Sequence, residues 1–215
     1  MRPYHKIQSV FMRGVDHKVI EGAYSLPEFE YLKSNDWTYT EKLDGCSLRT
    51  MFGPDENTGL SLLRFGGKTD NAQIYIPLLN RLQELFTIEK MLEAFSWYTE
   101  TPASICLYGE GIGAKVQKGG GNYISDGVDF ILFDIMVGDT WLERHNVAQI
   151  AERLSIKVVP IIGTGTLFQA TEMAKKGFNS KWGEFLAEGI VLRPQVELQT
   201  RRGHRIITKI KHKDF

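Results

Sequence analysis

The sequence predicts an α+β protein with mostly antiparallel sheets flanked by helices. Short apolar strand candidates occur in adjacent pairs, and segments with helical spacing separate these groups of strands. No Pro-, Gly- or Ser-rich linker is long enough to mark a domain boundary. We therefore expect residues 1–215 to form a single domain.

Composition limits the classes of protein that the chain can belong to. Its 26 Lys and Arg residues balance 26 Asp and Glu residues, so any contact with a polyanion must come from local patches. The two cysteines form no metal-type cluster, and their scarcity fits a reducing compartment. No apolar run approaches the roughly 20 residues that a membrane span needs. We expect a cytoplasmic monomer with no membrane attachment.

The first half of the chain predicts short strands and loops over residues 1–36, followed by a hairpin. Strand candidates lie at 37–43, 47–52 and 60–65, with a turn at 53–57. Apolar residues at helical spacing predict helix through most of 75–96, with a break near Thr87.

The second half alternates strands with two helices. The expected helices cover 144–155 and 166–176, and the second ends at Gly177, a residue type common after the last helical turn. The strand candidates lie at 104–110, 128–137, 158–162, 188–193 and 205–211, and the first of them runs into a Gly-rich loop at 111–121.

A motif at 41–45, which reads Glu-Lys-Leu-Asp-Gly, ends the first clear strand at a glycine suited to a tight turn. Alternate residues of a strand share a face, so Lys42 and Asp44 are predicted to point the same way. A lysine attacks only as the neutral amine, which burial or neighbouring positive charge favours. An ordinary hairpin contains the same residues, so the interpretation depends on the segments that follow.

Four further segments follow in chain order, and each also has a purely structural interpretation. They are Leu-Arg-Phe at 63–65, Leu-Tyr-Gly-Glu-Gly at 107–111, Asp-Phe-Ile-Leu-Phe-Asp-Ile at 129–135, and the pair Glu-Gly-Ile-Val-Leu-Arg-Pro at 188–194 with Arg-Ile-Ile-Thr-Lys-Ile-Lys at 205–211. In the last stretch a period of two puts Lys209 and Lys211 on one face, and puts Ile206, Thr208 and Ile210 on the other.

Together, in this order and spacing, the segments resemble the covalent nucleotidyltransferase superfamily, which comprises ATP-dependent DNA and RNA ligases and mRNA capping enzymes. The chain is most similar to the RNA ligase 2 group, named after a bacteriophage enzyme. The resemblance runs from about residue 37 to 215. It implies an adenylation domain that holds the nucleotide in a cleft between its sheets. The chain stops four residues after Lys211, so we expect no separate C-terminal domain.

The resemblance implies a role for each candidate residue. Lys42 would carry AMP covalently, and Glu41 would accept a hydrogen bond from the exocyclic amine of adenine, which guanine lacks at that position. Lys209 and Lys211 would contact the α-phosphate, and Asp44 would complete the catalytic set. The remaining implied roles are contact with the ribose or the incoming polynucleotide end by Arg64, ribose or metal contact by Glu110, purine stacking by Phe133, and metal binding by Glu188.

The implied activity is that of an ATP-dependent RNA ligase with Mg²⁺ or Mn²⁺. It would join the 3′-hydroxyl and 5′-phosphate ends of a polynucleotide through a lysyl-AMP and an adenylylated 5′ end. A DNA nick ligase is an alternative, although Ser47 stands where DNA ligases often have an arginine. A capping guanylyltransferase would use GTP, which Glu41 disfavours. A nucleotide- or RNA-end-binding module without ligation activity is the alternative from another class.

Overall fold

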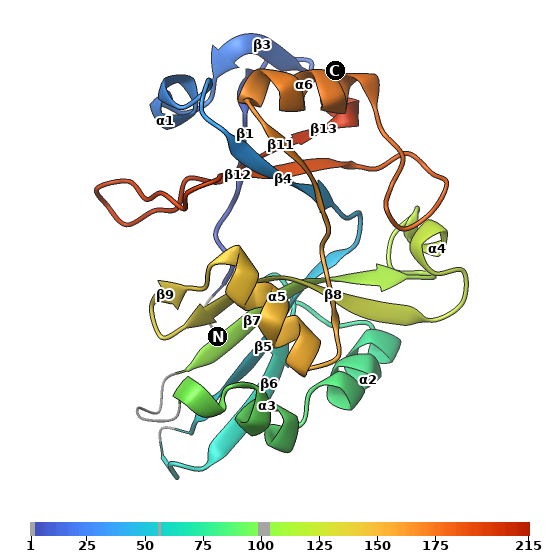
Figure 1. Cartoon of the computed structure of the whole chain (residues 1–215). Coiled ribbons are helices and arrows are strands. Elements are labelled where there is room, and N and C mark those ends of the chain that lie inside the picture. Colours follow the sequence, from blue (N-terminus) through green and yellow to red (C-terminus); the bar gives the residue numbers. More distant parts are fainter. Residues whose placement is uncertain (1–2, 56, 99–103) are drawn as a thin grey trace. The chain divides into compact units, whose positions relative to one another are not determined.

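The computed structural model describes residues 3–55, 57–98 and 104–215, which divide into two compact units (Figure 1). Unit 1 contains Asp44–Val158 and the N-terminal residues up to Tyr4, and unit 2 contains His5–Leu43 and Val159–Phe215. One boundary between the units falls inside the motif at 41–45. Glu41 and Lys42 therefore belong to unit 2, whereas Asp44 belongs to unit 1.

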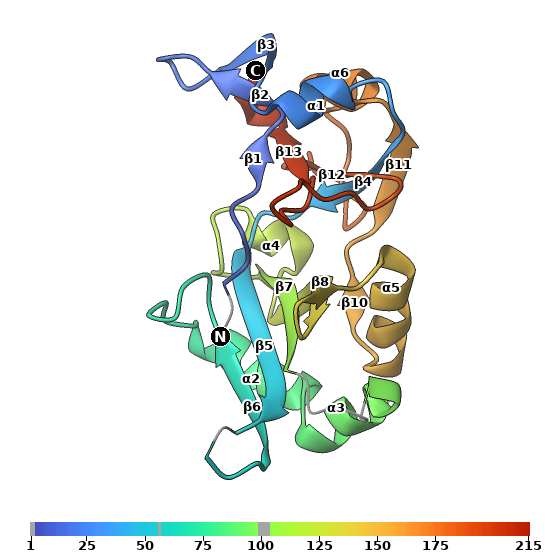
Figure 2. The ribbon, with the colours of Figure 1, turned by 90° about the vertical axis from the view of Figure 1, so that its left-hand side faces the viewer.

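Unit 1 is built on a six-stranded sheet in which β10, β8, β7, β5 and β6 are successive neighbours (Figure 2). The sixth strand, β9, pairs with β8. Neighbouring strands run antiparallel, except that β10 runs parallel to β8. The strands are β5 (Cys46–Pro54), β6 (Ser61–Gly66), β7 (Ile105–Gly113), β8 (Val128–Val137), β9 (Thr140–Trp141) and β10 (Lys157–Val158).

Helices cover one face of this sheet. A single apolar core contains Leu82 of α2 (Ile76–Leu85), Met91 of α3 (Ile88–Ala94) and Ile150 of α5 (Arg144–Arg153), together with Leu107 and Phe130 of the sheet. The three helices share this core, so they pack on the same face. A short α4 (Gly120–Tyr123) and a 3-10 turn, η1 (Ser96–Tyr98), complete the unit.

Unit 2 holds a five-stranded sheet in the order β1-β13-β12-β4-β11, and α6 packs against one face of it (Figure 1). Ala170 of α6 shares a core with Trp37, Ile190 and Ile210 of the sheet. Only β1 runs parallel to its neighbour in this sheet. The strands are β1 (Gln8–Ser9), β4 (Trp37–Lys42), β11 (Ile161–Gly165), β12 (Gly189–Pro194) and β13 (Thr208–Lys211). The other elements are the hairpin β2 (Phe11–Arg13) and β3 (Val19–Tyr24), the helices α1 (Pro27–Tyr31) and α6 (Leu167–Lys176), and η2 (His212–Asp214).

The α+β class with mostly antiparallel sheets is confirmed, and several element boundaries differ from the prediction. The expected strand at 158–162 is two strands in different units, β10 and β11, because Pro160 interrupts it. The closing strand begins only at Thr208, and β5 continues to Pro54 into the expected turn, of which residue 56 lies outside the described residues. The expected end at Gly177 is confirmed, with a φ of 78° at that glycine.

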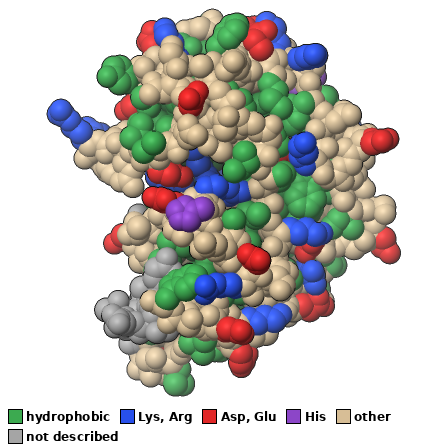
Figure 3. Space-filling model, viewed as in Figure 1, with side chains coloured by type: hydrophobic (Ala, Val, Ile, Leu, Met, Phe, Trp, Pro, Cys, Tyr) green, Lys and Arg blue, Asp and Glu red, His purple; other side chains and the backbone are tan. Residues whose placement is uncertain are grey.

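The described helices are short, and the visible surface carries charges of both signs. None of the helices in the described ranges has the length and apolarity that crossing a membrane requires. Acidic and basic side chains are interspersed over the visible face of each unit, in keeping with zero net charge (Figure 3). Basic side chains also project at the tip of the loop between β12 and β13, where Arg201 and Arg202 are exposed.

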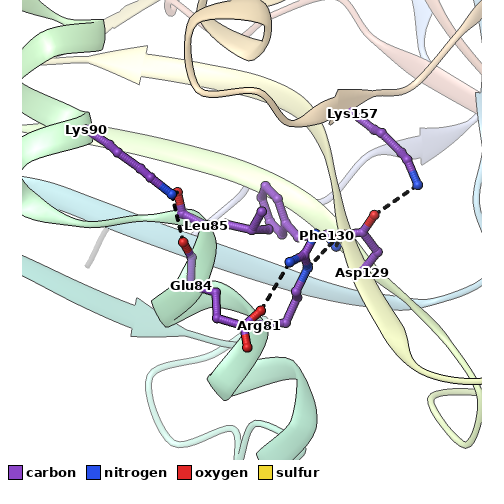
Figure 4. A network of polar contacts seen from close by, with 7 residues as sticks. All are labelled: Arg81, Glu84, Leu85, Lys90, Asp129, Phe130 and Lys157. Carbon is purple, nitrogen blue, oxygen red and sulfur yellow. Dashed lines mark hydrogen bonds and ion pairs between the residues drawn. The ribbon is translucent and has the colours of Figure 1, made fainter.

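A buried carboxylate joins three elements of unit 1 (Figure 4). Asp129, at the start of β8, accepts hydrogen bonds from Arg81 of α2 at 3.1 Å and from the backbone N–H of Phe130 at 3.0 Å. Its other oxygen accepts from Lys157 of β10 at 3.1 Å. Asp129 is 8% exposed, so these donors compensate for water that it has lost.

We expect Asp129→Asn to lower the free energy of unfolding by about 2 kcal/mol, because the amide loses charge-assisted hydrogen bonds to two cations. Urea unfolding followed by circular dichroism measures the change. Asp126→Asn is the matched control, since Asp126 is exposed in the same unit and should change stability by less than about 0.5 kcal/mol. Equal stabilities of the two variants would contradict this account of the network.

Candidate active site

Three residues of unit 2 lie side by side in neighbouring strands. Gly189 of β12 is in register with Lys42 of β4 on one side and with Lys211 of β13 on the other. Residues in register point to the same face of a sheet. A Cβ atom at Gly189 would lie 2.2 Å from the carbonyl oxygen of Ile210, so no side chain fits there. The two lysines therefore flank a position that has no side chain of its own.

Glu188 joins these two lysines. Its Oε2 lies 2.5 Å from Nζ of Lys42, and its Oε1 lies 2.5 Å from Nζ of Lys211. The side chains are 10%, 22% and 19% exposed for Glu188, Lys42 and Lys211, so the ion pairs are only partly hydrated. The sequence predicted cationic neighbours for Lys42 and did not predict that a carboxylate contacts both amines.

Lys209 lies on the same face as Lys211. Along β13, Thr208 and Ile210 are buried, whereas the two lysines are partly exposed, which confirms the predicted alternation. Lys209 is in register with Val191 of β12 and with Ser9 of β1. The sheet therefore presents three lysines, Lys42, Lys209 and Lys211, on the face opposite α6.

Glu41 precedes Lys42 and is 2% exposed. Its Oε1 accepts a hydrogen bond from Oγ of Ser180 at 2.5 Å, and its Oε2 accepts one from the backbone N–H of Lys181 at 2.8 Å. Sequence reasoning missed Ser180, which stands 139 residues from Glu41 and carries no local signal of its role. The two contacts hold the carboxylate in a fixed position, and each oxygen keeps one lone-pair site.

Asp44 was predicted to share a strand face with Lys42. The strand β4 ends at Lys42, so Asp44 lies outside it. Asp44 is exposed, and its backbone N–H donates to the hydroxyl of Tyr123 at 3.0 Å. A Cβ atom at Gly45 would lie 2.2 Å from the carbonyl oxygen of Gly111. The glycine is therefore required because β7 approaches the backbone closely at this point. The prediction had attributed it to a tight turn.

Arg64 and Glu110 both lie in unit 1. The Arg64 side chain in β6 is 51% exposed and lies 3.5 Å from Asp55, which makes it a weakly held surface cation. Glu110 in β7 is half-buried and in register with Ser47. Burial raises the pKa of the nearby Cys46 thiol to about 11, and the Glu110 carboxylate adds to this shift. Cys46 is therefore a neutral thiol near pH 7.

Phe133 is part of an aromatic cluster on the face of the unit 1 sheet opposite the helices. The ring of Tyr4 meets the Phe133 ring edge-on at 5.1 Å and meets the Tyr108 ring at 5.0 Å. The hydroxyl of Tyr4 donates to Asp134 at 2.7 Å, and Asp134 is fully buried. This contact explains how a carboxylate is accommodated in an apolar strand, and sequence reasoning had no signal for the role of Tyr4.

Comparison with known proteins places the chain in a family. A family model described as RNA ligase matches residues 35–211, from the start of the motif region to Lys211. The chain belongs to the RNA ligase family. A search of curated proteins found no match.

Solved structures of an RNA ligase from Naegleria gruberi share the fold of this RNA ligase family member. The structure with PPi has 22% identity and a TM-score of 0.63, and the match covers 87% of this chain and 52% of that chain. A lysine variant of the same enzyme with ATP and Mn has 22% identity and a TM-score of 0.63, with 88% and 55% of the two chains covered. The chain thus spans about half the length of these structures.

Glu188 and Glu110 are the two acidic residues expected to bind a metal ion. In the described ranges, no group of three or more His, Cys, Asp or Glu side chains is arranged to hold one. Mg²⁺ commonly binds through one or two carboxylates together with substrate phosphates. Glu188 fits a cation that arrives with a nucleotide, provided that the cation replaces a lysine contact. The expected second ligand, Glu110, lies in the other unit.

Proposed function

We propose that this chain is the nucleotidyltransferase part of an ATP-dependent RNA ligase, and that residues 1–215 act as one such domain. The observation that carries the proposal is the position of Lys42. Its amine and that of Lys211 share the Glu188 carboxylate at 2.5 Å each, on a lysine-bearing face of the sheet. This arrangement gives a nucleophile a neighbouring cation that can neutralise a phosphate.

In the first step, the neutral amine of Lys42 attacks the α-phosphorus of ATP. A P–N bond forms, the P–O bond to pyrophosphate breaks, and the attacking nitrogen gives up one proton to solvent. An ion-paired lysine carries its proton and is not a nucleophile, so Lys42 must leave Glu188 and release that proton to solvent before it attacks. Lys209 and Lys211 stabilise the negative charge that develops on the phosphate. A bound Mg²⁺ or Mn²⁺, with Glu188 as ligand, would supply further charge neutralisation.

In the second step, AMP passes from Lys42 to a polynucleotide 5′-phosphate, which breaks the P–N bond and forms a pyrophosphate linkage. In the third step, a 3′-hydroxyl attacks the 5′-phosphorus and expels AMP. Both steps depend mainly on positioning and charge stabilisation. The substrate that we propose is RNA with 3′-hydroxyl and 5′-phosphate ends.

The remaining roles follow from the resemblance. We propose that Glu41 accepts from the adenine amine, and its two fixed oxygens support that role. The proposed roles of Arg64, Glu110 and Phe133 are ribose contact, ribose or metal contact, and purine stacking, and Asp44 belongs to the proposed catalytic set. The Naegleria enzyme with ATP and Mn supports the proposed cofactors.

We also propose a monomer that works in the cytoplasm. Both cysteines are free thiols, Cys106 buried and Cys46 half-buried. Free thiols are usual in reducing compartments, which supports this location.

The test is to incubate the purified chain with ATP and Mg²⁺ and to locate an AMP-sized adduct by mass spectrometry. We expect a single adduct, on Lys42. We also expect the chain to seal nicks in RNA-containing duplexes faster than nicks in all-DNA duplexes. Faster sealing of all-DNA nicks would favour a DNA ligase. An adduct without sealing of either substrate would mean that the chain adenylylates itself but does not ligate alone. No adduct would contradict the proposal.

A further inference from the structure

A buried carboxylate in unit 2 contacts the backbone of Lys211, one of the two lysines that Glu188 joins. Asp214 of η2 is 2% exposed. Its Oδ2 accepts the backbone N–H of Lys211 at 3.0 Å, and its Oδ1 accepts from Nη2 of Arg13 at 2.7 Å. Each carboxylate oxygen therefore has one strong donor, and one of these donors belongs to the backbone of the residue that contacts Glu188.

The sheet explains why Lys211 takes a side chain as its acceptor. The pairing of β1 with β13 covers only Thr208 and Lys209, and the N–H of Val10 then donates to the carbonyl of Lys209. The ladder with β1 ends there, so the N–H of Lys211 lies beyond it. Asp214 supplies the acceptor, and the next N–H, that of His212, donates to the carbonyl of Glu188 at 3.1 Å.

Arg13 supplies the charge that balances Asp214. It comes from β2, 201 residues away in sequence, and its Nη1 also donates to the carbonyl of His17 at 2.7 Å. The two contacts fix the plane of the guanidinium. A buried carboxylate that lost this partner would keep its desolvation cost without compensation.

We propose that Asp214 and Arg13 are positioning residues that act on the reaction through Lys211. Contacts within one unit run from Arg13 to Asp214, from Asp214 to Lys211, and from Lys211 through Glu188 to Lys42. The pair fixes the backbone of Lys211, and a fixed backbone holds its amine where it meets Glu188 in the free protein and the phosphate in the reaction. This inference rests on the proposed self-adenylylation.

The test is a double-mutant cycle on the single-turnover rate of self-adenylylation. Asp214→Ala should lower that rate about tenfold, the size expected for a lost hydrogen bond to a charged group, while the half-saturating ATP concentration stays within about twofold. Asp214→Asn keeps one acceptor and should recover part of the rate. Arg13→Ala leaves Asp214 in place but removes its ion pair, and it should also lower the rate of self-adenylylation. In a Lys211→Ala background, Asp214→Ala should have no further effect.

Glu21→Gln is the matched control, because Glu21 forms an ion pair of the same 2.7 Å length with Lys175 in the same unit, and its side chain is 46% exposed. It should leave the rate unchanged. Hydrogen exchange gives a second readout: the Lys211 amide should exchange at least about tenfold faster in Asp214→Ala.

Additive losses in the cycle, or unchanged exchange at Lys211, would overturn the inference even if the wild-type protein adenylylates itself. A wild-type protein that takes up no AMP would instead refute the proposed function, and the exchange measurement would still decide whether Asp214 holds Lys211.

Discussion

We expect the Lys42→Ala variant to form no covalent AMP adduct, whereas the wild-type chain becomes labelled in the presence of ATP and Mg²⁺. Removal of the side chain removes the nitrogen that bonds to phosphorus, so neither ATP nor the metal can restore the adduct. Lys42→Arg should also remain unlabelled, because an arginine stays protonated and cannot supply a free lone pair. Intact-protein mass spectrometry with peptide mapping measures the adduct.

Two controls separate chemistry from folding. Lys33→Ala removes an exposed lysine of the same unit and should label at the wild-type rate. Circular dichroism should show that Lys42→Ala remains folded, since its side chain is partly exposed and packs no core. An adduct of normal yield on the Lys42→Ala protein would show that another residue carries the nucleotide.

Sequence patterns predicted most elements because local chemistry determines them. The apolar run at 128–137 is β8 over that range. The predicted break near Thr87 is real, since the Thr87 side chain accepts from the N–H of Lys90 and caps α3. The five-residue α1 was missed because it spans little more than one turn, although Pro27 marks its start.

The contacts of the site were beyond sequence reasoning for a physical reason. Glu188 meets Lys42 across 146 residues, and Ser180 meets Glu41 across 139. Such contacts depend on strand register, and a period of two shows which side chains share a face but not which strands are neighbours. For the same reason, the sequence predicted Lys209 and Lys211 as the charged neighbours of Lys42 and did not predict its contact with the Glu188 carboxylate.

The second large effect concerns Glu188. We expect Glu188→Gln to lower the rate of self-adenylylation by about 10²- to 10³-fold, the range found when a charge-stabilising group is removed from an active site. The amide keeps the size of the side chain but not its charge. Two partly buried ammonium groups a few ångströms apart then repel each other by about 3 kcal/mol, and the proposed metal loses its carboxylate. Single-turnover labelling at several Mg²⁺ concentrations measures the effect.

Two consequences of Glu188→Gln oppose each other, and the metal titration separates them. Loss of the ion pair frees the Lys42 amine, which favours attack, whereas loss of the carboxylate weakens metal binding and misplaces Lys42. We expect the second to prevail, so the half-saturating Mg²⁺ concentration should rise by about tenfold or more. Glu172→Gln, on the exposed side of α6, should change neither quantity. If the rate falls while the half-saturating Mg²⁺ concentration stays the same, Glu188 is not the metal ligand. Its role would then be to orient the two lysines.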